Sequence, residues 1–600
     1  MGKLVAQNKW LFIGAALCVL ISVVIDYLTP LLLAETLDYY LSGQPSTMPA
    51  FVNRWVDSWG GPNFMARNLW IVGLALVGLN IVGGAINFFK GRWQSKAGEN
   101  VALYLRERLY EHIQHLPFSY HVKAETGDMV QRCTSDVDTV RRFLASQLLA
   151  VVSSVLMIVV ALTMLFSKNV QLALISMVMV PAIFCFAFLF FKWVVKAFGD
   201  ADVSEGRLSA VLQENLTGVR VVRAFGQQQY EVEKFTGASA DYKKKSFKVS
   251  KLLAVYWAGS DTMCMIQSGI TLIMCVLFAA RGEITVGTMV VFTSYVGKLL
   301  WPIRQLGRIL ADLGKADISL SRLEDILAVL AEAEPGKALT PQIDGSVAFE
   351  DVCFDYGDGV PVLSHVSFTV RPGQTIGILG STGAGKSSLV QLIARLYDAT
   401  AGEVLVGGHD VREYDLAVLR DAVGVVLQKN VLFTGTVRDN LRWGNAKATD
   451  EELLEACRLA CVDEFLDRIG GLDGDLGQGG AGVSGGQKQR LCIARALLKR
   501  PRILIFDDST SAVDMATEAK IRANLASIPG VTCIVIAQRI TSVMDADKIV
   551  VLDDGHLHAQ GTHVELLETD AIYQEIYASQ VRHADKATPD DFLRGGEAHA

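Results

Sequence analysis

The chain has 600 residues, of which 51% are hydrophobic, and a formal net charge of -7. This length exceeds that of one ordinary core and predicts two or three domains. The acidic balance, with no basic stripe interleaved with aromatics, argues against a nucleic-acid binder. Hydrophobic residues dominate the first half, whereas from about residue 340 onward the pattern is that of a soluble α/β domain.

Six apolar runs in the first half are each long enough to cross about 30 Å of hydrocarbon. They cover residues 10–33, 69–89, 147–166, 170–195, 252–280 and 285–303. The first run continues through Leu33 without a small-residue cleavage pattern, so we expect a retained helix and not a signal peptide. The runs predict a polytopic helical membrane domain over residues 1–325.

Positive charge is concentrated in two long polar segments of this half. Lysine and arginine are frequent between residues 90 and 132 and between residues 192 and 251, whereas the other loops carry few. The positive-inside rule therefore predicts that both segments, the N-terminus and the second half of the chain are cytoplasmic.

Both cytoplasmic segments have apolar residues at helical spacing, as in 101–116, and predict helices that continue beyond the membrane. Each segment has a turn signal near its middle, at Leu116–Tyr120 in the first and at Asn215–Gly218 in the second. We expect these tips, near 116–122 and 212–220, to contact the second half of the chain.

Asp26 in the first run and Asp261 in the fifth place carboxylates at membrane depth, which is a functional hypothesis by default. The alternative is an interfacial position, as for Glu35 and Asp38, where water makes the charge unremarkable. Both interpretations stay open on the sequence alone.

Two further groups of side chains also allow two interpretations each. Phe51, Trp55 and Trp59 form a short apolar face that could lie at the headgroup level or pack on its own loop. Cys457 and Cys461, four apart on an expected helix, could form a functional thiol pair, but small buried hydrophobes in a reduced cytosol are the favoured interpretation.

A phosphate-binding motif opens the second half. The pattern G-x-x-x-x-G-K-[ST] is matched by Gly380, Ser381, Thr382, Gly383, Ala384, Gly385, Lys386 and Ser387. Its glycines allow successive backbone N–H groups to point into one concavity, Lys386 would reach the β- and γ-phosphates, and Ser387 would hold Mg²⁺. A buried strand at 375–379 precedes the motif, and a helix from Ser388 to Leu396 follows and favours anion binding at its N-terminus.

A second nucleotide motif lies downstream, where the apolar run Ile503–Phe506 ends in Asp507 and Asp508. A buried strand that ends in a carboxylate is the partner that a phosphate loop needs, because the acid positions the metal and its water.

Between these motifs, Ser484, Gly485, Gly486 and Gln487 resemble the signature of the ATP-binding-cassette (ABC) family. The resemblance implies that Tyr356 stacks on adenine and that Gln428 senses the metal and the membrane domain. It also identifies a D-loop at Ser511, Ala512, Val513 and Asp514 and a switch position at Gln538. The chain is similar to bacterial exporter-type half-transporters, in which each signature completes the ATP site of another chain and the hairpin tips act as coupling helices.

The chain departs from the family pattern in its hydrolytic residues. The resemblance places a glutamate base at Asp508 and a histidine at Gln538; an aspartate reaches less far, and an amide cannot titrate. Gln478 also stands where many relatives have a glutamate, and Val483 where leucine is usual. The residues expected to bind ATP and Mg²⁺, with Ser387, Gln428 and Asp507 on the metal, are intact.

The sequence therefore predicts a six-helix membrane domain, a linker at 326–345, an α/β nucleotide-binding domain at 346–580 and a disordered tail at 581–600. We expect the degenerate-site half of a heterodimeric exporter of hydrophobic or amphipathic compounds in the bacterial plasma membrane. Its partner would supply the missing glutamate and histidine. A homodimer with two slow sites and an ATP-gated channel or sensor are the alternatives.

Overall fold

The computed structural model describes residues 6, 8–46, 48, 50–332, 338–508 and 513–585. The chain forms two compact units. The first unit holds the residues up to Gln114 together with Thr126–Val329, and the second holds His115–Glu125 together with the chain from Leu330 onward. The short segment 115–125 thus belongs to the second unit, although in the sequence it interrupts the first.

The first unit is helical, and its described residues contain six helical spans long and apolar enough to cross a membrane. The spans are Lys9–Leu41, Trp70–Gln114, Thr126–Lys168, Val170–Ala224, Gln228–Ala280 and Val286–Gln305. They confirm the fold class predicted from the apolar runs. Their helices are α2 (Lys9–Glu35) with η1 (Thr36–Leu41), α5 (Trp70–Gln114), α7 (Thr126–Gln131), η2 (Arg132–Asp136), α8 (Val137–Arg142), η3 (Phe143–Gln147), α9 (Leu148–Lys168), α10 (Val170–Ile175), α11 (Val180–Ala224), α12 (Gln228–Ala280) and α13 (Val286–Ala328), with the short outer helices α3 (Ala50–Ser58) and α4 (Gly61–Arg67).

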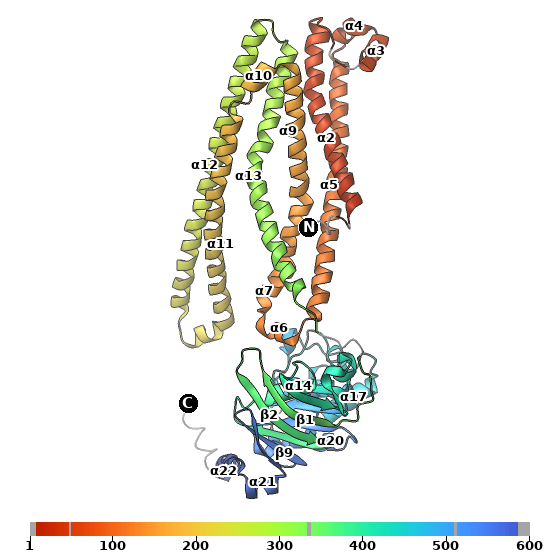
Figure 1. Ribbon diagram of the computed structural model, residues 1–600, viewed down its shortest axis with the longest axis vertical. Coiled ribbons are helices and arrows are strands. Elements are labelled where there is room, and N and C mark those ends of the chain that lie inside the picture. The colour runs from red at the N-terminus through yellow and green to blue at the C-terminus, as the bar shows by residue number, and fades with distance from the viewer. Residues whose placement is uncertain are drawn as a thin grey trace. The chain divides into compact units, whose positions relative to one another are not determined.

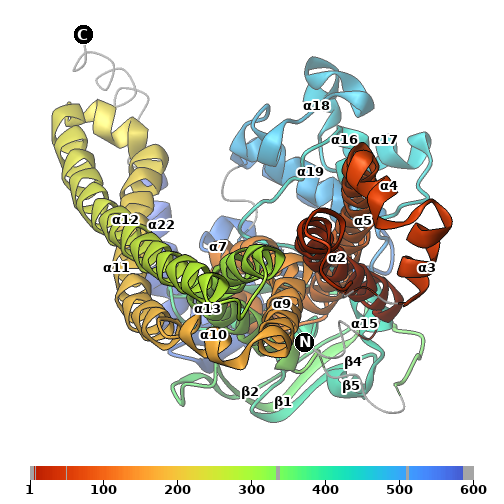
Figure 2. The same cartoon turned by 90° about the horizontal axis from the view of Figure 1, so that it is seen from above.

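Besides α13, which has 43 residues, three of these helices extend well beyond a membrane span. A crossing needs about 20 residues, whereas α5, α11 and α12 have 45, 45 and 53 residues. Their polar ends are the helical extensions predicted for the two lysine- and arginine-rich segments. Figures 1 and 2 show α11 and α12 side by side, as expected for a two-helix hairpin.

The turn of the second hairpin differs from the sequence prediction. The predicted turn, Asn215–Gly218, lies inside α11, and the chain reverses at Phe225–Gln227 instead. Gly226 has φ +64°, and the Gln227 amide donates to the Val222 carbonyl at 3.0 Å, which is the hydrogen-bond pattern of a glycine-terminated helix. Glycine within a helix costs only about 1 kcal/mol, so Gly218 does not end it.

Asp261 of α12 is paired with a cation of α13. Its Oδ1 lies 2.7 Å from Nη2 of Arg304. The guanidinium also lies 5.0 Å from the ring centre of Trp257 and 5.7 Å from that of Trp301, distances at which the aromatic faces attract it. Asp261 therefore has an interhelical partner that accounts for its charge without a ligand.

Asp26 and Asp38 also have neighbours within the first unit. Asp26 is half-buried, its carbonyl accepts a hydrogen bond from Lys298 of α13, and that ammonium lies 5.5 Å from the ring centre of Tyr27. Asp38 accepts the Gly287 amide at 2.8 Å, at the first turn of α13. A carboxylate at a helix N-terminus satisfies an otherwise unpaired N–H group, so Asp38 has a structural role.

The first outer loop forms the small helix α3 with one face inward. Val56 is buried against Tyr40 and Met65. Trp55 and Trp59 stay exposed, with ring centres 4.4 Å apart, and the side chain of Phe51 lies outside the described residues. The loop thus packs through Val56 and presents the tryptophan pair outward.

The second unit contains two sheets and confirms the predicted α/β class. A four-stranded antiparallel sheet has the order β2-β1-β4-β5, and a six-stranded sheet has the order β10-β9-β3-β8-β7-β6, parallel except for β10. The strands are β1 (Val347–Asp355), β2 (Pro361–Val370), β3 (Thr375–Gly380), β4 (Ala401–Val406), β5 (His409–Asp410), β6 (Val423–Val426), β7 (Ile503–Asp507), β8 (Thr532–Ile536), β9 (Lys548–Asp553) and β10 (His556–Gly561). The helices are α6 (Phe118–Lys123), α14 (Lys386–Ile393), α15 (Leu416–Ala422), α16 (Val437–Leu441), α17 (Asp450–Leu459), α18 (Asp463–Leu466), α19 (Gly485–Leu498), α20 (Met515–Ala526), α21 (His563–Thr569) and α22 (Ala571–Asp585), with single turns η4 (Val411–Glu413), η5 (Asp467–Ile469), η6 (Gly471–Asp473), η7 (Gln478–Gly480) and η8 (Ile540–Ser542).

The core of this unit follows from its continuous apolar strands. All five residues of β7 are buried, as expected for a parallel strand covered on both faces. Helix α14 ends at Ile393, three residues before the expected Leu396, and Arg395 just beyond it has φ +48°. Residues 581–585, where we expect the tail to begin, continue α22, and residues 586–600 lie outside the described chain.

Candidate nucleotide site

The parallel strands bring the candidate residues to one edge of the six-stranded sheet. β8 lies between β3 and β7, and Ile536 of β8 pairs with both Ile378 and Asp507. The carboxyl ends of parallel strands meet at one edge, which is where open α/β sheets bind ligands. The phosphate-binding loop after β3, the carboxylates after β7 and Gln538 after β8 therefore converge, and Gln428 joins them from β6.

The phosphate-binding loop has a shape that requires glycine at its last turn. Gly385 has φ +87°, and a Cβ there would lie 2.7 Å from Leu363 and 2.8 Å from the Val362 carbonyl. The Lys386 ammonium donates to the carbonyls of Gly380 and Ser381 at 2.8 and 2.7 Å. Burial lowers its pKa, and the nearby carboxylates of Asp508 and Asp507 oppose that shift. A phosphate in the loop would meet a cation already held at its rim.

Ser387 and Asp507 form the candidate Mg²⁺ site. The Ser387 hydroxyl donates to Asp507 Oδ1 at 2.8 Å. Burial raises the pKa of Asp507, and the hydrogen bond from Ser387 offsets part of the rise. A hydroxyl and a carboxylate oxygen are the hard ligands that Mg²⁺ takes beside phosphate oxygens, so these two residues fit the metal.

Asp508, Gln538 and Gln428 form a second polar group beside this site. The Gln538 amide donates to Asp508 Oδ2 at 2.8 Å, and the Gln428 amide approaches the same oxygen at 3.4 Å. Asp508 has φ +46°, which is unusual for a residue other than glycine. Burial raises its pKa, and the charge of Lys386 opposes the shift. The two positions at which the sequence departs from the expected family pattern are thus in direct contact.

Tyr356 lies beside the helix that follows the loop. Its hydroxyl is hydrogen-bonded to that of Ser388 at 2.7 Å. Phe354 and Tyr397 pack edge-on against its ring, with centres 4.9 and 5.2 Å away. The residue is still 39% exposed, so an aromatic base could stack on it.

The same aromatic cluster extends to the first hairpin tip. Phe118 of α6 packs edge-on against Tyr397 with ring centres 5.6 Å apart. Nearby, the Glu332 amide donates to the His115 carbonyl at 2.8 Å. Tyr397 was not predicted from the sequence, because it belongs to no motif and simply follows Leu396 after the end of α14. Its contacts connect the tip to Tyr356.

The signature segment forms the start of α19. Ser484 and Gln487 make a reciprocal capping box: the Ser484 amide donates to Gln487 Oε1 at 2.9 Å, and the Gln487 amide points to the serine hydroxyl. Gly485 has open space around a notional Cβ, and Val483 is buried. The capping box thereby fixes the start of α19, and the N-terminus of a helix favours an anion.

The D-loop lies partly outside the described residues, because Ser511 and Ala512 are not among them. Val513 is buried, and Asp514 caps α20 by accepting the Thr517 amide at 2.9 Å. Asp514 therefore has a local structural role that its motif does not reveal.

Cys457 and Cys461 are free and buried. Burial raises the pKa of Cys457 to about 12, which leaves its thiol protonated and unreactive at neutral pH. The interpretation as small buried hydrophobes therefore fits the structure.

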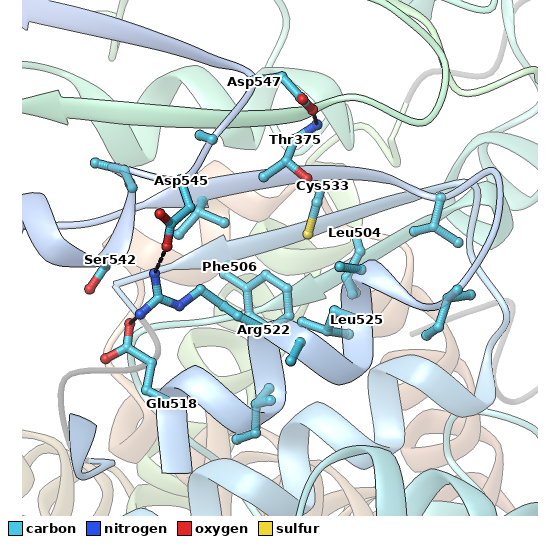
Figure 3. Close-up of a pocket in the computed structure, with 18 of the residues that line it drawn as sticks. Thr375, Leu504, Phe506, Glu518, Arg522, Leu525, Cys533, Ser542, Asp545 and Asp547 are labelled. Atoms are coloured by element: carbon cyan, nitrogen blue, oxygen red, sulfur yellow. Dashed lines mark hydrogen bonds and ion pairs between the residues drawn. The ribbon is translucent and has the colours of Figure 1, made fainter. Parts of the chain in front are cut away.

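A cavity of this unit lies away from the candidate nucleotide site (Figure 3). It measures about 540 Å³ and is lined by α20, strands β7 and β8 and the segment 542–547. Arg522 lies at its edge, 3.7 Å from Asp545 and 4.0 Å from Glu518. The cavity contains none of the phosphate-loop residues.

Six membrane-spanning helices and one phosphate-loop domain carrying a signature segment define an ATP-driven half-transporter. The chain belongs to the ABC transporter family: residues 12–303 match the ABC transporter transmembrane region, and residues 363–511 match the ABC transporter domain. It is a multi-pass membrane protein of the exporter type, in which ATP hydrolysis is coupled to transport.

Its relatives cover nearly the whole chain. The ABC transporter ATP-binding protein YknU of Bacillus subtilis (strain 168) is 32% identical over 582 residues, 95% of each chain. The putative multidrug export ATP-binding/permease protein YgaD of the same organism is 31% identical, covering 82% of this chain and 86% of its own. The structure of a bacterial Atm1-family ABC exporter with ATP bound matches with TM-score 0.79 and 26% identity, over 96% of this chain and 99% of that one.

Proposed function

We propose that this chain is the slow-hydrolysing half of a heterodimeric exporter. The observation that carries the proposal is the pair Asp508 and Gln538, which occupy the expected positions of the catalytic base and the switch residue and contact each other at 2.8 Å. Each residue is less suited to its position than the usual glutamate or histidine. The nucleotide site of this chain would therefore bind ATP and hydrolyse it slowly.

Slow hydrolysis is expected because the side chain of Asp508 is short and that of Gln538 cannot carry a positive charge. An aspartate is shorter than a glutamate by one methylene, about 1.5 Å, whereas a general base must come within about 3.2 Å of the attacking water. The Asp508 carboxylate is also engaged by the Gln538 amide, which can donate a hydrogen bond but cannot become a cation. Both departures weaken activation of water.

The binding residues support retention of ATP. Lys386 would meet the β- and γ-phosphates, Tyr356 would stack on adenine, and Ser387, Asp507 and Gln428 would hold Mg²⁺. ATP supplies the phosphoanhydride whose cleavage drives the cycle. The protein's part is to hold the phosphates against the loop and α14, whose N-terminus favours negative charge.

The signature would serve the other site of the dimer. Ser484–Gln487 would face the phosphates held by a partner subunit that carries an intact glutamate and histidine. Hydrolysis would then occur mainly at that second site. The capping box that orders Ser484 supports this division of roles.

The hairpin tips would couple the motor to the membrane domain. The edge-to-face contact between Phe118 and Tyr397 supports α6 as one coupling helix. The second coupling element, first expected at 212–220, would now include the turn at 225–227, which forms the end of its hairpin.

Hydrophobic or amphipathic compounds are the proposed substrates, and the bacterial plasma membrane is the proposed location. The name of YgaD, a putative multidrug export protein, supports the substrate class. The lysine- and arginine-rich extensions of α5, α11 and α12 support a cytoplasmic motor and N-terminus.

Purification with and without a partner tests the assembly. The chain would be isolated alone and with a co-expressed neighbouring half-transporter, both reconstituted in lipid, and their ATPase rates compared. We expect robust hydrolysis only from the pair. Robust hydrolysis by the chain alone would favour the homodimer, and ATP-gated conductance without uphill transport would favour a channel.

A further inference from the structure

The C-terminal helix α22 is hydrogen-bonded to the main chain of the switch segment, defined here as residues 538–542. One side-chain amide makes both bonds: Gln580 Oε1 accepts the Ile540 amide at 2.8 Å, and Gln580 Nε2 donates to the Gln538 carbonyl at 2.8 Å. The oxygen and the nitrogen of one side-chain amide thus bind two residues of the switch segment, Ile540 and Gln538, and Gln538 in turn contacts Asp508. Such a two-point contact fixes orientation as well as position.

Packing around the switch segment is uneven. On one side Ile540 and Val543 are fully buried in an apolar cluster with Tyr573, Ile576 and Tyr577 of α22. On the other side Ser542 and Val543 line the 540 Å³ cavity, which Figure 3 shows between the sheet and α20. The segment is also held by Arg522, which donates to the Thr541 carbonyl at 2.9 Å, and by the strand residues of the same apolar cluster. Helix α22 is thus one of the elements that fix its position, and the one that binds its main chain at both 538 and 540.

A chain of polar contacts continues from this clamp to the nucleotide site. Gln580 holds the Gln538 main chain, the Gln538 side chain donates to Asp508, and Asp508 lies beside the charge of Lys386. A shift of the Gln538 backbone would therefore change the hydrogen bond at Asp508. The helix itself is anchored independently, since Tyr573 is buried and its hydroxyl is bonded to His563 at 2.6 Å.

We propose that Gln580 is a positioning residue for the switch segment, so that docking of α22 sets the geometry of the side chain at position 538. Gln580 contacts neither the candidate phosphate site nor the metal site and acts through the backbone of residues 538 and 540. This inference goes beyond the proposed function and holds whether the site hydrolyses ATP quickly or slowly.

Amide hydrogen exchange of the purified exporter tests the clamp directly. Gln580→Met keeps side-chain length and helix propensity but removes both hydrogen bonds. Loss of two bonds predicts roughly tenfold faster exchange in the peptide covering 538–542, with β8 and β9 unchanged. The matched control is Gln574→Met, because Gln574 is also on α22 and its amide donates to the Leu567 carbonyl at 2.7 Å.

Three exchange results would overturn the proposal: an unchanged switch segment, equal acceleration throughout the second unit, or the same local effect from Gln574→Met. Gln580→Glu is a second variant should the methionine variant fail to fold. It retains an acceptor for the Ile540 amide but removes the donor to the Gln538 carbonyl, so the peptide covering 538–542 should exchange faster than in the wild type. Exchange equal to the wild type would contradict a role for the hydrogen bond to the Gln538 carbonyl.

A functional readout separates positioning from folding. In the variant Asp508→Glu with Gln538→His, adding Gln580→Met should lower nucleotide trapping at this chain's own site about tenfold and leave ATP affinity within twofold. A parallel loss of affinity would indicate a general structural effect and contradict positioning. If the double variant gains no hydrolysis, the proposed function fails, while the exchange experiment still decides the role of Gln580.

Discussion

Asp508 and Gln538 carry the proposed loss of hydrolysis through side-chain length and charge, two properties that substitution can change independently. The carboxylate lies on a residue with φ +46°, and the amide that contacts it comes from the neighbouring strand end. The site thus has a shorter carboxylate and a neutral amide at the positions where a glutamate and a histidine are expected. Restoring those groups is the most direct chemical change available.

Asp508→Glu combined with Gln538→His should increase hydrolysis at this chain's own site by about tenfold or more. A positioned general base contributes about 10²–10⁴-fold, of which a scaffold adapted to aspartate should recover part. Trapping of hydrolysed nucleotide, mapped by photolabelling of each subunit, measures the change. If trapping stays confined to the partner subunit, the two residues are not the cause of slow turnover.

Lys386→Met should weaken ATP binding at the same site by about 10–100-fold, because a hydrogen bond to a charged group contributes about 1.5–3 kcal/mol. Equilibrium binding of a labelled nucleotide to the purified chain gives the affinity. Lys447→Met is the control, since Lys447 is an exposed lysine on a loop of the same unit. An unchanged affinity in Lys386→Met would show that Gly380–Ser387 is not the phosphate-binding loop.

Some of the functional residues can be predicted from the sequence and others cannot. The residues 380–387 follow from a motif because their function requires a fixed spacing of glycines and a lysine. Tyr397 and Gln580 belong to no motif: their contacts depend on tertiary placement, Tyr397 beside α6 and Gln580 beside the switch segment. In sequence, a tyrosine that follows a helix or a glutamine on a helix surface is indistinguishable from any other residue in such a place.

At the scale of elements, helix α6 packs on the rest of the second unit through the aromatic pair Phe118 and Tyr397. Phe118→Ala should lower the amount of substrate transported per ATP hydrolysed, because an edge-to-face pair contributes about 0.5–1.5 kcal/mol beyond its buried area. Tyr397→Ala should have a similar effect, and the double variant should add little to either, as expected for residues in direct contact. Transport and ATPase rates in proteoliposomes measure the ratio.

Tyr120→Ala is the matched control for that prediction. Tyr120 is on the same short helix, and its ring contacts that of the neighbouring His121. Equal uncoupling by Tyr120→Ala, or full additivity of the Phe118 and Tyr397 substitutions, would contradict a specific role for the pair.

The Asp261–Arg304 pair should stabilise the packing of α12 on α13. Arg304→Gln is expected to lower the free energy of unfolding in detergent by about 1–2 kcal/mol, because it removes both an ion pair and two cation–π contacts. Thermal unfolding of the purified protein measures the change. Exchanging the two charges (Asp261→Arg with Arg304→Asp) should recover part of the loss. Arg281→Gln is the control, since Arg281 is exposed and lies 3.9 Å from Glu283.

The helices and strands could be predicted from the sequence wherever a single property, such as the length of an apolar run, determines the element. The six membrane spans follow from apolar length, and β3 and β7 follow from continuous apolar runs that end at functional residues. The second hairpin turn was misplaced because Gly218 resembles a helix breaker in sequence. The actual stop uses Gly226, whose positive φ allows the terminal hydrogen bonds, and local sequence does not distinguish the two glycines.

At the scale of the whole molecule, the division of labour between two nucleotide sites is the central claim. The chain supplies an ordered signature in Ser484–Gln487 and a phosphate loop with intact binding residues, but it lacks the usual base and switch residue. A dimer with a complete partner would therefore have one slow and one fast site. The proposed asymmetry would be a property of the assembled dimer.

Site-resolved nucleotide trapping in the co-purified, wild-type assembly measures that asymmetry most directly. With vanadate and a photoreactive ATP analogue, we predict hydrolysed nucleotide mainly on the partner subunit and intact nucleotide on Gly380–Ser387 of this chain. Equal amounts of trapped, hydrolysed nucleotide on both subunits would contradict the account.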